Sequence, residues 1–285
     1  MRSLIVALIG AVLAGNAVNA QPLEGRLKTV QESATLRIAY RTDSRPFSYL
    51  DSDGKPVGYS IELCQRIAKS IERQLGLPSL TIRWVPVDTR TRFESIVNGT
   101  ADLECGSTTI SLSRLKIVDF SSLIYAESTG VLVKTGRGMF NFDSMAGRKI
   151  GVVPGSTNAN AIRDQLKQRK FEAILVDFPD REQGIAALGR GVIDGFATDK
   201  LVLLALAQAA NLRDYTMLPD DLSFEPFAIM LPRGDWAFRL AVNTGLARVF
   251  RSGEVIEIYT KYFSTLAPRP SAWIGAVFTF GALPE

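Results

Sequence analysis

The chain contains two runs of alternating strand and helix patterns, and these runs constrain its fold more than any other feature. The first run has the order strand, helix, strand, helix, strand over residues 36–41, 61–75, 81–87, 92–97 and 101–105. The second run repeats that order over residues 149–153, 157–170, 173–178, 183–188 and 195–198. Alternation of this kind is typical of a mostly parallel sheet with helices on its faces. We therefore predict an α/β protein with two lobes, each built on such a sheet.

The two runs also match locally in sequence. Residues 96–106 read IVNGTADLECG, and residues 188–198 read LGRGVIDGFAT. The aligned pairs are Gly99 with Gly191 and Asp102 with Asp194. Because the match falls at the same point of both runs, it favours two similar lobes.

Extended apolar segments at residues 128–136 and 224–235 lie between the two runs and after the second. Two crossings between two lobes describe a hinge. Helical patterns at Trp236–Phe250 and Gly253–Phe263 follow, and we expect them to return to the first lobe. The predicted first lobe therefore comprises residues 21–131 and 230–285, and the second lobe, with the hinge crossings, comprises residues 132–229.

Residues 1–20 have the features of a secretory signal peptide. A positive charge precedes Leu4–Ala14, which is apolar but too short to span a bilayer. Small residues at Val18 and Ala20 fit a signal-peptidase site, and no cysteine follows that would indicate a lipoprotein. An uncleaved membrane anchor is the alternative. We expect cleavage near Ala20/Gln21 and export to the periplasm.

The composition argues against several classes of function. The chain has 285 residues, two cysteines, no histidine and a formal net charge of +4. Because it has no run of lysine and arginine, we do not expect it to bind nucleic acid. Without histidine there is no ordinary zinc site and no base to activate Ser107. We therefore expect a binding protein with no catalytic residue, no metal and no cofactor.

Cys64 and Cys105 are the only cysteines in the chain. In an exported protein the simplest use of two cysteines is one disulfide. Cys64 lies on a predicted helix and Cys105 at the end of a predicted strand, so contact between them is reasonable. Two buried free thiols are the alternative.

Polar residues follow the predicted strands at Arg41, Gly106–Thr109, Pro154–Thr157 and Asp199. Ligands of open parallel sheets bind beyond the carboxyl ends of the strands, so we expect these residues to line a cleft between the lobes. The candidate binding groups are arginine guanidinium ions, hydroxyls, the N-terminus of a helix and one carboxylate. They are Arg41, Arg92, Arg114, Thr89, Ser107, Thr109, Ser156, Thr157 and Asp199.

The motifs resemble those of bacterial periplasmic solute-binding proteins for polar amino acids, the capture subunits of ABC importers. The resemblance covers about residues 34–265 and is closest to the glutamate/aspartate-binding branch. It rests on RTDSRPFSY (41–49), VGYSIELC (57–64), RFESIVNGTADLECGSTT (92–109), SRLKIVDFS (113–121), VVPGST (152–157) and GFATDK (195–200). It implies the type II periplasmic binding protein fold, with two lobes and a hinge.

The resemblance also implies roles for the groups that every amino acid carries. Arg114 would clamp the ligand α-carboxylate, helped by Thr109 and by the turn that contains Ser156 and Thr157. Asp199 would hold the α-ammonium together with the region of Ser107.

In the branch for acidic ligands, Arg41, Arg92 and Thr89 would receive the side-chain carboxylate. Charge matching agrees, because glutamate and aspartate carry two carboxylates and one ammonium. Where relatives often have histidine, this chain has Arg181, which either adds a third cation to the side-chain pocket or points outward. Some relatives pair the cysteine of ECGST with one at the position of Ile229, and this leaves Cys64 as the partner of Cys105. The tail at residues 268–285 matches no motif of the family.

The implied function is capture of glutamate or aspartate by a monomer that delivers it to membrane permease subunits, which work with a separate ATPase. An exported cyclohexadienyl dehydratase, acting on arogenate or prephenate, is an alternative on the same fold. A glutamine- or asparagine-binding protein and a sensory binding protein are the others. A difference of one methylene is worth only about 1–3 kcal/mol in a pocket, so glutamate and aspartate stay equally open.

Overall fold

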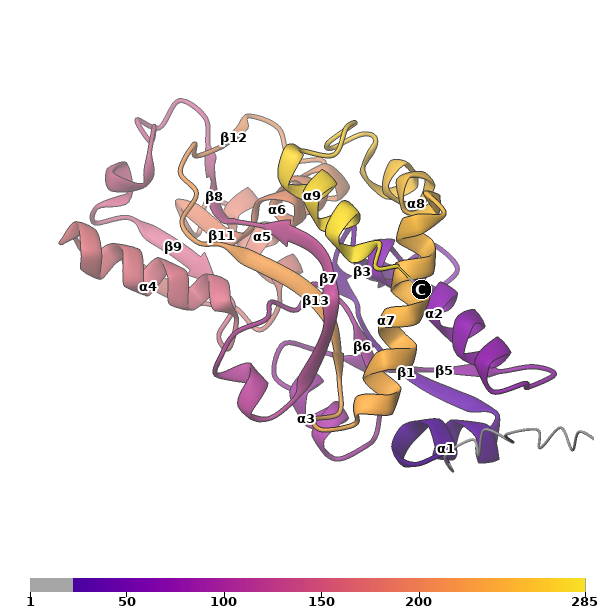
Figure 1. The fold of residues 1–285 in the computed structure, drawn as a ribbon. Coiled ribbons are helices and arrows are strands. Elements are labelled where there is room, and N and C mark those ends of the chain that lie inside the picture. Colours follow the sequence, from indigo (N-terminus) through magenta and orange to yellow (C-terminus); the bar gives the residue numbers. More distant parts are fainter. Residues whose placement is uncertain (1–22, 285) are drawn as a thin grey trace, which may run out of the picture.

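A computed structural model describes residues 23–284 and contains two lobes, each built on a five-stranded sheet (Figure 1). The strands of the first sheet are, in spatial order, β5 (Thr81–Val87), β1 (Thr35–Arg41), β6 (Leu103–Cys105), β13 (Glu225–Leu231) and β7 (Asp119–Glu127). The first three strands are parallel, and the last two are antiparallel to their neighbours. A small sheet of β2 (Asp43–Ser44), β3 (Ser48–Leu50) and β4 (Pro56–Val57) adjoins it.

The second sheet has the same arrangement. Its strands are, in spatial order, β10 (Ile174–Asp177), β9 (Lys149–Val152), β11 (Gly195–Asp199), β8 (Thr129–Lys134) and β12 (Tyr215–Met217). Again three strands are parallel and two are antiparallel. In both sheets the parallel strand that comes first in the chain lies between the second and the third, as two similar lobes require.

The local sequence match between the lobes is a structural match. Gly99 and Gly191 both have positive φ angles, of 74° and 71°, which glycine adopts without strain. The carboxylate of Asp102 accepts a hydrogen bond from the backbone N–H of Arg37 at 2.8 Å. Asp194 likewise accepts one from the backbone N–H of Lys149 at 2.9 Å. Each aspartate therefore ties the turn before the third strand to the start of the first strand.

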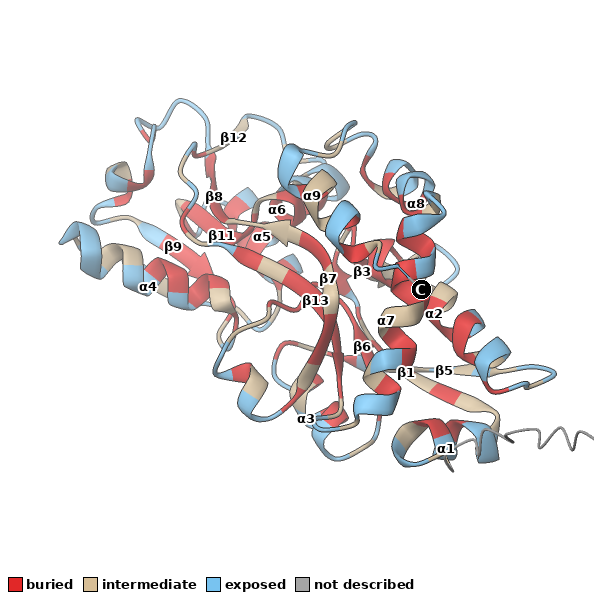
Figure 2. Cartoon of the chain, in the orientation of Figure 1, coloured by how far each residue is buried: buried red, intermediate tan, exposed pale blue. Residues whose placement is uncertain are grey.

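Helices cover the faces of both sheets. The first lobe has α1 (Gly25–Ser33), α2 (Tyr59–Gln74), α3 (Arg92–Val97), the 3-10 turn η1 (Arg114–Lys116), α7 (Trp236–Arg251), α8 (Glu254–Phe263) and α9 (Ala272–Gly281). The second lobe has η2 (Phe142–Met145), α4 (Thr157–Arg169), α5 (Arg181–Gly189) and α6 (Lys200–Ala209). As expected, α7 and α8 return to the first lobe, where both pack against α2. Figure 2 shows that the buried residues concentrate on the strands and on the helix faces turned toward them.

The predicted disulfide is confirmed. Cys64 on α2 and Cys105 at the end of β6 are joined, with their Cα atoms 6.5 Å apart. The bond fastens a covering helix to a central strand immediately before the polar loop that follows Cys105.

The two lobes are connected through β7 and β13, which lie side by side (Figure 1). Only Ser128 separates β7 from β8, so the chain enters the second lobe without a loop. Aromatic rings of Phe47, Tyr125 and Phe227 pack on one another, with centroids 5.0–6.3 Å apart, and brace this pair of strands from the first lobe. The exact residues at which one lobe gives way to the other stay a prediction.

The predicted signal peptide lies outside the described residues. Within residues 23–284, no helix combines the length and the apolar character that crossing a membrane requires.

Candidate ligand-binding site

The candidate site lies where the parallel strands of the two sheets end. Arg41 closes β1, residues 106–109 follow β6, and Asp199 closes β11. The turn after β9 leads into α4, whose N-cap is Ser156. Strand topology therefore brings the residues predicted from the sequence to facing edges of the two lobes.

Arg41 and Arg92 are buried cations of the first lobe, with 0% and 3% of their surface exposed. The Nη2 group of Arg41 donates to Asp43 at 2.6 Å and to Thr89 at 2.8 Å. The Nη1 group of Arg92 donates to Thr108 at 2.8 Å. Burial lowers the pKa of Arg92 well below its usual value, and the positive charge of Arg41 adds to this effect. Charges held this far from water favour an anionic partner.

The loop that carries Thr108 and Thr109 is fixed against the beginning of β13. The backbone N–H of Ala228 donates to the carbonyl of Thr108 at 3.1 Å, and Thr109 forms an isolated bridge with Phe227. The Nη1 group of Arg114 in turn donates to the carbonyl of Thr109 at 2.7 Å. Arg114 is thus held beside the loop.

Arg181 and Asp199 form the charged pair of the second lobe. Arg181 begins α5 and is buried rather than directed outward. Whether it adds a cation to the pocket for the ligand side chain stays a prediction. Its Nη2 group pairs with Asp199 at 3.1 Å, and its Nε group donates to Thr198 at 2.9 Å. The other oxygen of Asp199 accepts from the side-chain amide of Asn158 at 2.8 Å.

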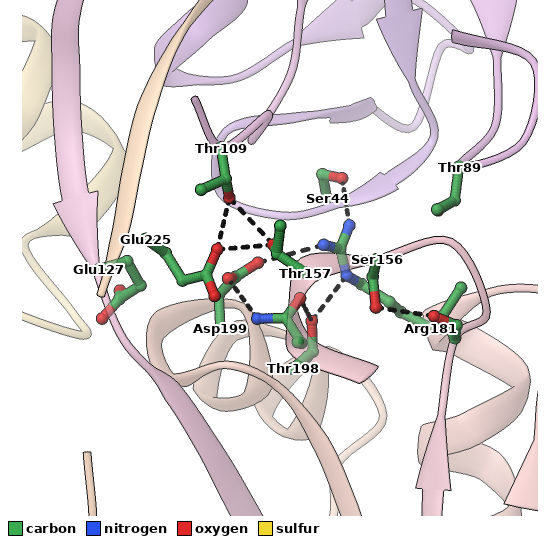
Figure 3. Close-up of polar contacts among 12 residues, drawn as sticks. Ser44, Thr89, Thr109, Glu127, Ser156, Thr157, Arg181, Thr198, Asp199 and Glu225 are labelled. Carbon is green, nitrogen blue, oxygen red and sulfur yellow. Dashed lines mark hydrogen bonds and ion pairs between the residues drawn. The ribbon is translucent and has the colours of Figure 1, made fainter. Parts of the chain in front are cut away.

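Side chains from the two lobes meet directly at this place, as Figure 3 shows. The Thr109 and Thr157 hydroxyls lie 3.2 Å apart, and both donate to Oε2 of Glu225 at 2.6 Å. Arg181 donates from Nη1 to the Ser44 hydroxyl at 2.7 Å. The lobes therefore contact one another through polar side chains on both sides of Asp199.

The electrostatics of the site depend on the balance between burial and ion pairing. For Asp43, burial raises the pKa, but Arg41 and Arg181 outweigh it and hold the pKa at about 2. For Asp199, burial dominates and raises the pKa to about 6, although Arg181 opposes it; the charge of Glu225 adds to the rise. Asp43 is therefore a permanent anion near neutral pH, whereas Asp199 is close to gaining a proton.

Buried polar atoms without a hydrogen-bond partner mark the same region. Within residues 23–284 these side-chain atoms are Nε and Nη1 of Arg41, Nε of Arg92, Oε1 of Glu104 and Oγ of Ser107. Buried polar groups in proteins are nearly always paired, so a cluster of unpaired ones indicates a place made to contact something else. Three of the five are guanidinium donors, and these suit a carboxylate.

The predicted site residues fall in this region. Arg41, Thr89, Arg92, Ser107, Thr109, Arg114, Ser156, Arg181 and Asp199 are buried, and Thr157 is half-buried. The Ser156 hydroxyl is used locally, since it accepts from the N–H of Ala159 at 3.0 Å and donates to the carbonyl of Val153.

Sequence reasoning missed the acidic members of the site other than Asp199. They are Asp43, Glu104 and Glu225, of which Glu104 and Glu225 are buried to 0% and 1% exposure. With Asp199 they balance the four arginines in formal charge. Glu104 alone offered a signal, because a carboxylate inside an apolar strand is rarely buried without a reason. No group of acidic or cysteine side chains within the described residues could hold a metal ion.

Comparison with known proteins identifies the family of this chain. The model of the family described as bacterial extracellular solute-binding proteins, family 3, matches residues 36–265. The L-glutamate/L-aspartate-binding protein of Pseudomonas aeruginosa is 33% identical over 268 residues, which cover 93% of this chain and 89% of that protein. The glutamate/aspartate import solute-binding protein of Salmonella typhimurium is 27% identical over 94% of this chain and 90% of its own length.

Solved structures support the same conclusion. The structure of an ancestral arginine-binding protein bound to arginine superposes with a TM-score of 0.73 at 26% sequence identity. The match covers 81% of this chain and 98% of that protein's chain. The two lobes and the hinge are thus those of the type II periplasmic binding protein fold, and the resemblance seen in the sequence motifs is confirmed. This chain belongs to the bacterial extracellular solute-binding proteins of family 3.

Proposed function

We propose that the protein is the amino-acid-binding component of an ABC importer and that its ligand is L-glutamate or L-aspartate. The observation that carries the proposal is the cluster of unpaired, buried guanidinium donors on Arg41 and Arg92. An amino acid with a side-chain carboxylate would pair with these donors. The relatives of this protein that are named for glutamate and aspartate support the same ligand class.

The backbone groups of the ligand would be shared between the lobes. Arg114 and Thr109 of the first lobe would bind the α-carboxylate, with the turn before α4 completing the contact. Asp199 of the second lobe would bind the α-ammonium and would exchange part of its pairing with Arg181 for that contact. Thr89 and Ser107 would add hydroxyl groups.

Binding of this kind couples to closure of the lobes. Each lobe supplies only some of the groups that one ligand needs, so a bound amino acid gains its full set of contacts only when the cleft is shut. A ligand stabilises whichever conformation gives it the greater affinity, and this would be the closed one. The closed protein would then deliver the amino acid to permease subunits in the membrane, working from the periplasm after removal of residues 1–20.

A thermal-shift screen of the protein, lacking residues 1–20, against the twenty amino acids tests the proposal. A ligand present at about 100 times its Kd stabilises the folded state by about 2.7 kcal/mol, which is readily seen as a higher Tm. We expect glutamate and aspartate to give the largest shifts. Largest shifts from glutamine, histidine or arginine, with none from the two acids, would contradict the proposed ligand.

The alternative as a cyclohexadienyl dehydratase has no specific observation in its favour. It is separated from binding by incubating the protein with prephenate or arogenate and following formation of the aromatic product. We expect no turnover, because the proposed side-chain pocket carries two arginines.

A further inference from the structure

Glu104 is a buried carboxylate for which the proposed ligand has no use. It lies on β6 with 0% of its surface exposed, next to the arginines that would receive a ligand carboxylate. Negative charge at this position opposes an acidic ligand. Its burial among cations therefore needs an explanation other than ligand binding.

The hydrogen bonds of Glu104 lead to Arg92. The Thr108 hydroxyl donates its proton to Oε2 of Glu104 at 2.7 Å. Since a hydroxyl has one proton, Thr108 can only accept from Arg92, and Nη1 of Arg92 donates to it at 2.8 Å. Glu104 thus fixes the direction of the Thr108 hydroxyl, and Thr108 fixes one corner of the Arg92 guanidinium.

The packing around Glu104 is adapted to this arrangement. Gly106 separates the strand from the binding loop, and a Cβ atom there would lie 2.4 Å from Oε1 of Glu104 and 3.0 Å from Cγ of Arg41. Any larger residue would displace the carboxylate or the arginine. The chain therefore lets the Glu104 carboxylate and the Arg41 side chain approach the same point.

We propose that Glu104 is a positioning residue for recognition of the ligand side chain, acting through Thr108 on Arg92. The inference deepens the proposed function and rests on it. Glu104 acts through its Oε2 atom, which Thr108 binds, and its unpaired Oε1 is not expected to contact the ligand carboxylate. It holds Arg92 in one orientation, so that the unpaired Nε–H of Arg92 is directed toward the ligand rather than lost to another partner.

The test is a double-mutant cycle read as the ratio of affinities for the acid and its amide. Calorimetry would measure glutamate and glutamine, or aspartate and asparagine, for Glu104→Gln and for Thr108→Val, each alone and combined with Arg92→Met. We expect each single substitution to lower the acid-to-amide ratio by about tenfold, because a hydrogen bond to a charged group is lost or weakened. In the Arg92→Met background Thr108→Val should leave the ratio unchanged, and Glu104→Gln, which removes a charge that opposes the acid, should not lower it.

Two controls separate positioning from a general structural effect. Thr108→Ser keeps the hydroxyl and should retain the ratio of the unmodified protein. Glu94→Gln removes a carboxylate from the exposed side of α3, the helix that carries Arg92, and should leave the ratio unchanged. A lower Tm common to all variants would not by itself alter the ratio.

Contrary outcomes are equally clear. If Glu104→Gln raises or lowers the ratio equally with Arg92 present and with Arg92→Met, then Glu104 acts on the ligand directly and the inference is wrong. If Glu104→Gln and Thr108→Val leave the ratio unchanged, the inference is also wrong. If the unmodified protein prefers another amino acid, the proposed ligand fails, and the same cycle is run on affinity for the preferred one. Binding of no amino acid would contradict both proposals.

Discussion

At the scale of single residues, the site consists of arginine and carboxylate side chains that lie close to one another. Among the described residues, Arg41 and Arg92 each donate to a group within the protein and still have a buried donor without a partner. All three guanidinium nitrogens of Arg181, in contrast, donate to protein groups. Removing one partner of a buried ion pair strongly destabilises a protein, because the remaining charge stays buried without a partner. Substitutions here should therefore affect binding much more than substitutions of exposed arginines.

Arg114→Ala is expected to weaken binding of every amino acid alike, by roughly 2–5 kcal/mol, because the α-carboxylate would be left buried and unpaired. Isothermal titration of several amino acids measures this. Arg90→Ala is the matched control, since Arg90 is exposed and pairs only weakly with Asp88 at 3.5 Å. Wild-type affinity in Arg114→Ala would show that this residue does not hold the α-carboxylate.

Affinity for the ligand should fall as the pH is lowered from 7 to 5. The pKa of Asp199 is raised to about 6 by burial, against the opposing charge of Arg181 and with the negative charge of Glu225 adding to it. The ligand ammonium requires the ionised carboxylate, so protonation should reduce affinity by about tenfold at pH 5. Titrations at several pH values measure the slope. Asp199→Asn should bind weakly and without this slope, and the same slope in that variant would assign the effect to another group.

The raised pKa of Asp199 also makes the stability of the folded protein depend on pH. Its folded-state pKa of about 6 exceeds the ordinary value of 3.8, so the folded protein holds the proton more tightly than the unfolded chain does. The contribution of Asp199 to stability is therefore greatest below pH 4 and is lost as the pH rises through 6. Asp43, whose pKa is lowered to about 2, contributes stability above pH 4 that is lost as the pH falls through 2.

The sequence predicted the cations of the site better than its anions. Arg41, Arg92 and Arg114 stand in recognisable motifs near predicted strand ends, so both topology and resemblance indicated them. Glu225 begins a strand that is far away in sequence, and its partners Thr109 and Thr157 belong to different lobes. Such a contact depends on how the two lobes are placed, which no local pattern contains.

At the scale of elements, periodicity predicted the parallel core and missed segments without a clear period. Helix α6 has leucine, valine or alanine at eight of its ten positions, and no repeat distinguishes it from a buried strand. Helix α9 carries no charged residue, yet it packs along β7 with Ile274 and Phe278 buried. Its Trp273 and Phe280 are exposed.

The disulfide should matter for stability more than for recognition. Cys64 and Cys105 are 41 residues apart, and closing a loop of that length stabilises the folded state by about 4 kcal/mol in the chain-entropy model. The double substitution Cys64→Ala and Cys105→Ala should therefore lower the free energy of unfolding by about 2–4 kcal/mol. Urea unfolding with and without reductant measures this, and unreduced peptide mapping identifies the bond. Equal unfolding midpoints for the two proteins under non-reducing conditions would contradict the prediction.

At the scale of the whole molecule, the two lobes have the same sheet arrangement but place different charged side chains at the candidate site. Both have the same strand order and the same aspartate at the turn before the third strand. The first lobe contributes Arg41, Arg92 and Arg114, whereas the second contributes Arg181 and Asp199. The strands β7 and β13 continue from the first sheet to the crossings, so motion of the lobes would bend these two segments.

The central claim is that the candidate site is built for an amino acid with a second carboxylate. Calorimetric titration of the protein lacking residues 1–20 with glutamate, aspartate, glutamine and asparagine at pH 7.5 tests it most directly. The account predicts that at least one acid binds about a hundredfold or more tightly than its own amide, because the unpaired guanidinium donors of Arg41 and Arg92 pair better with a carboxylate than with a neutral amide. Equal affinity for acid and amide, or preference for the amide, would contradict it.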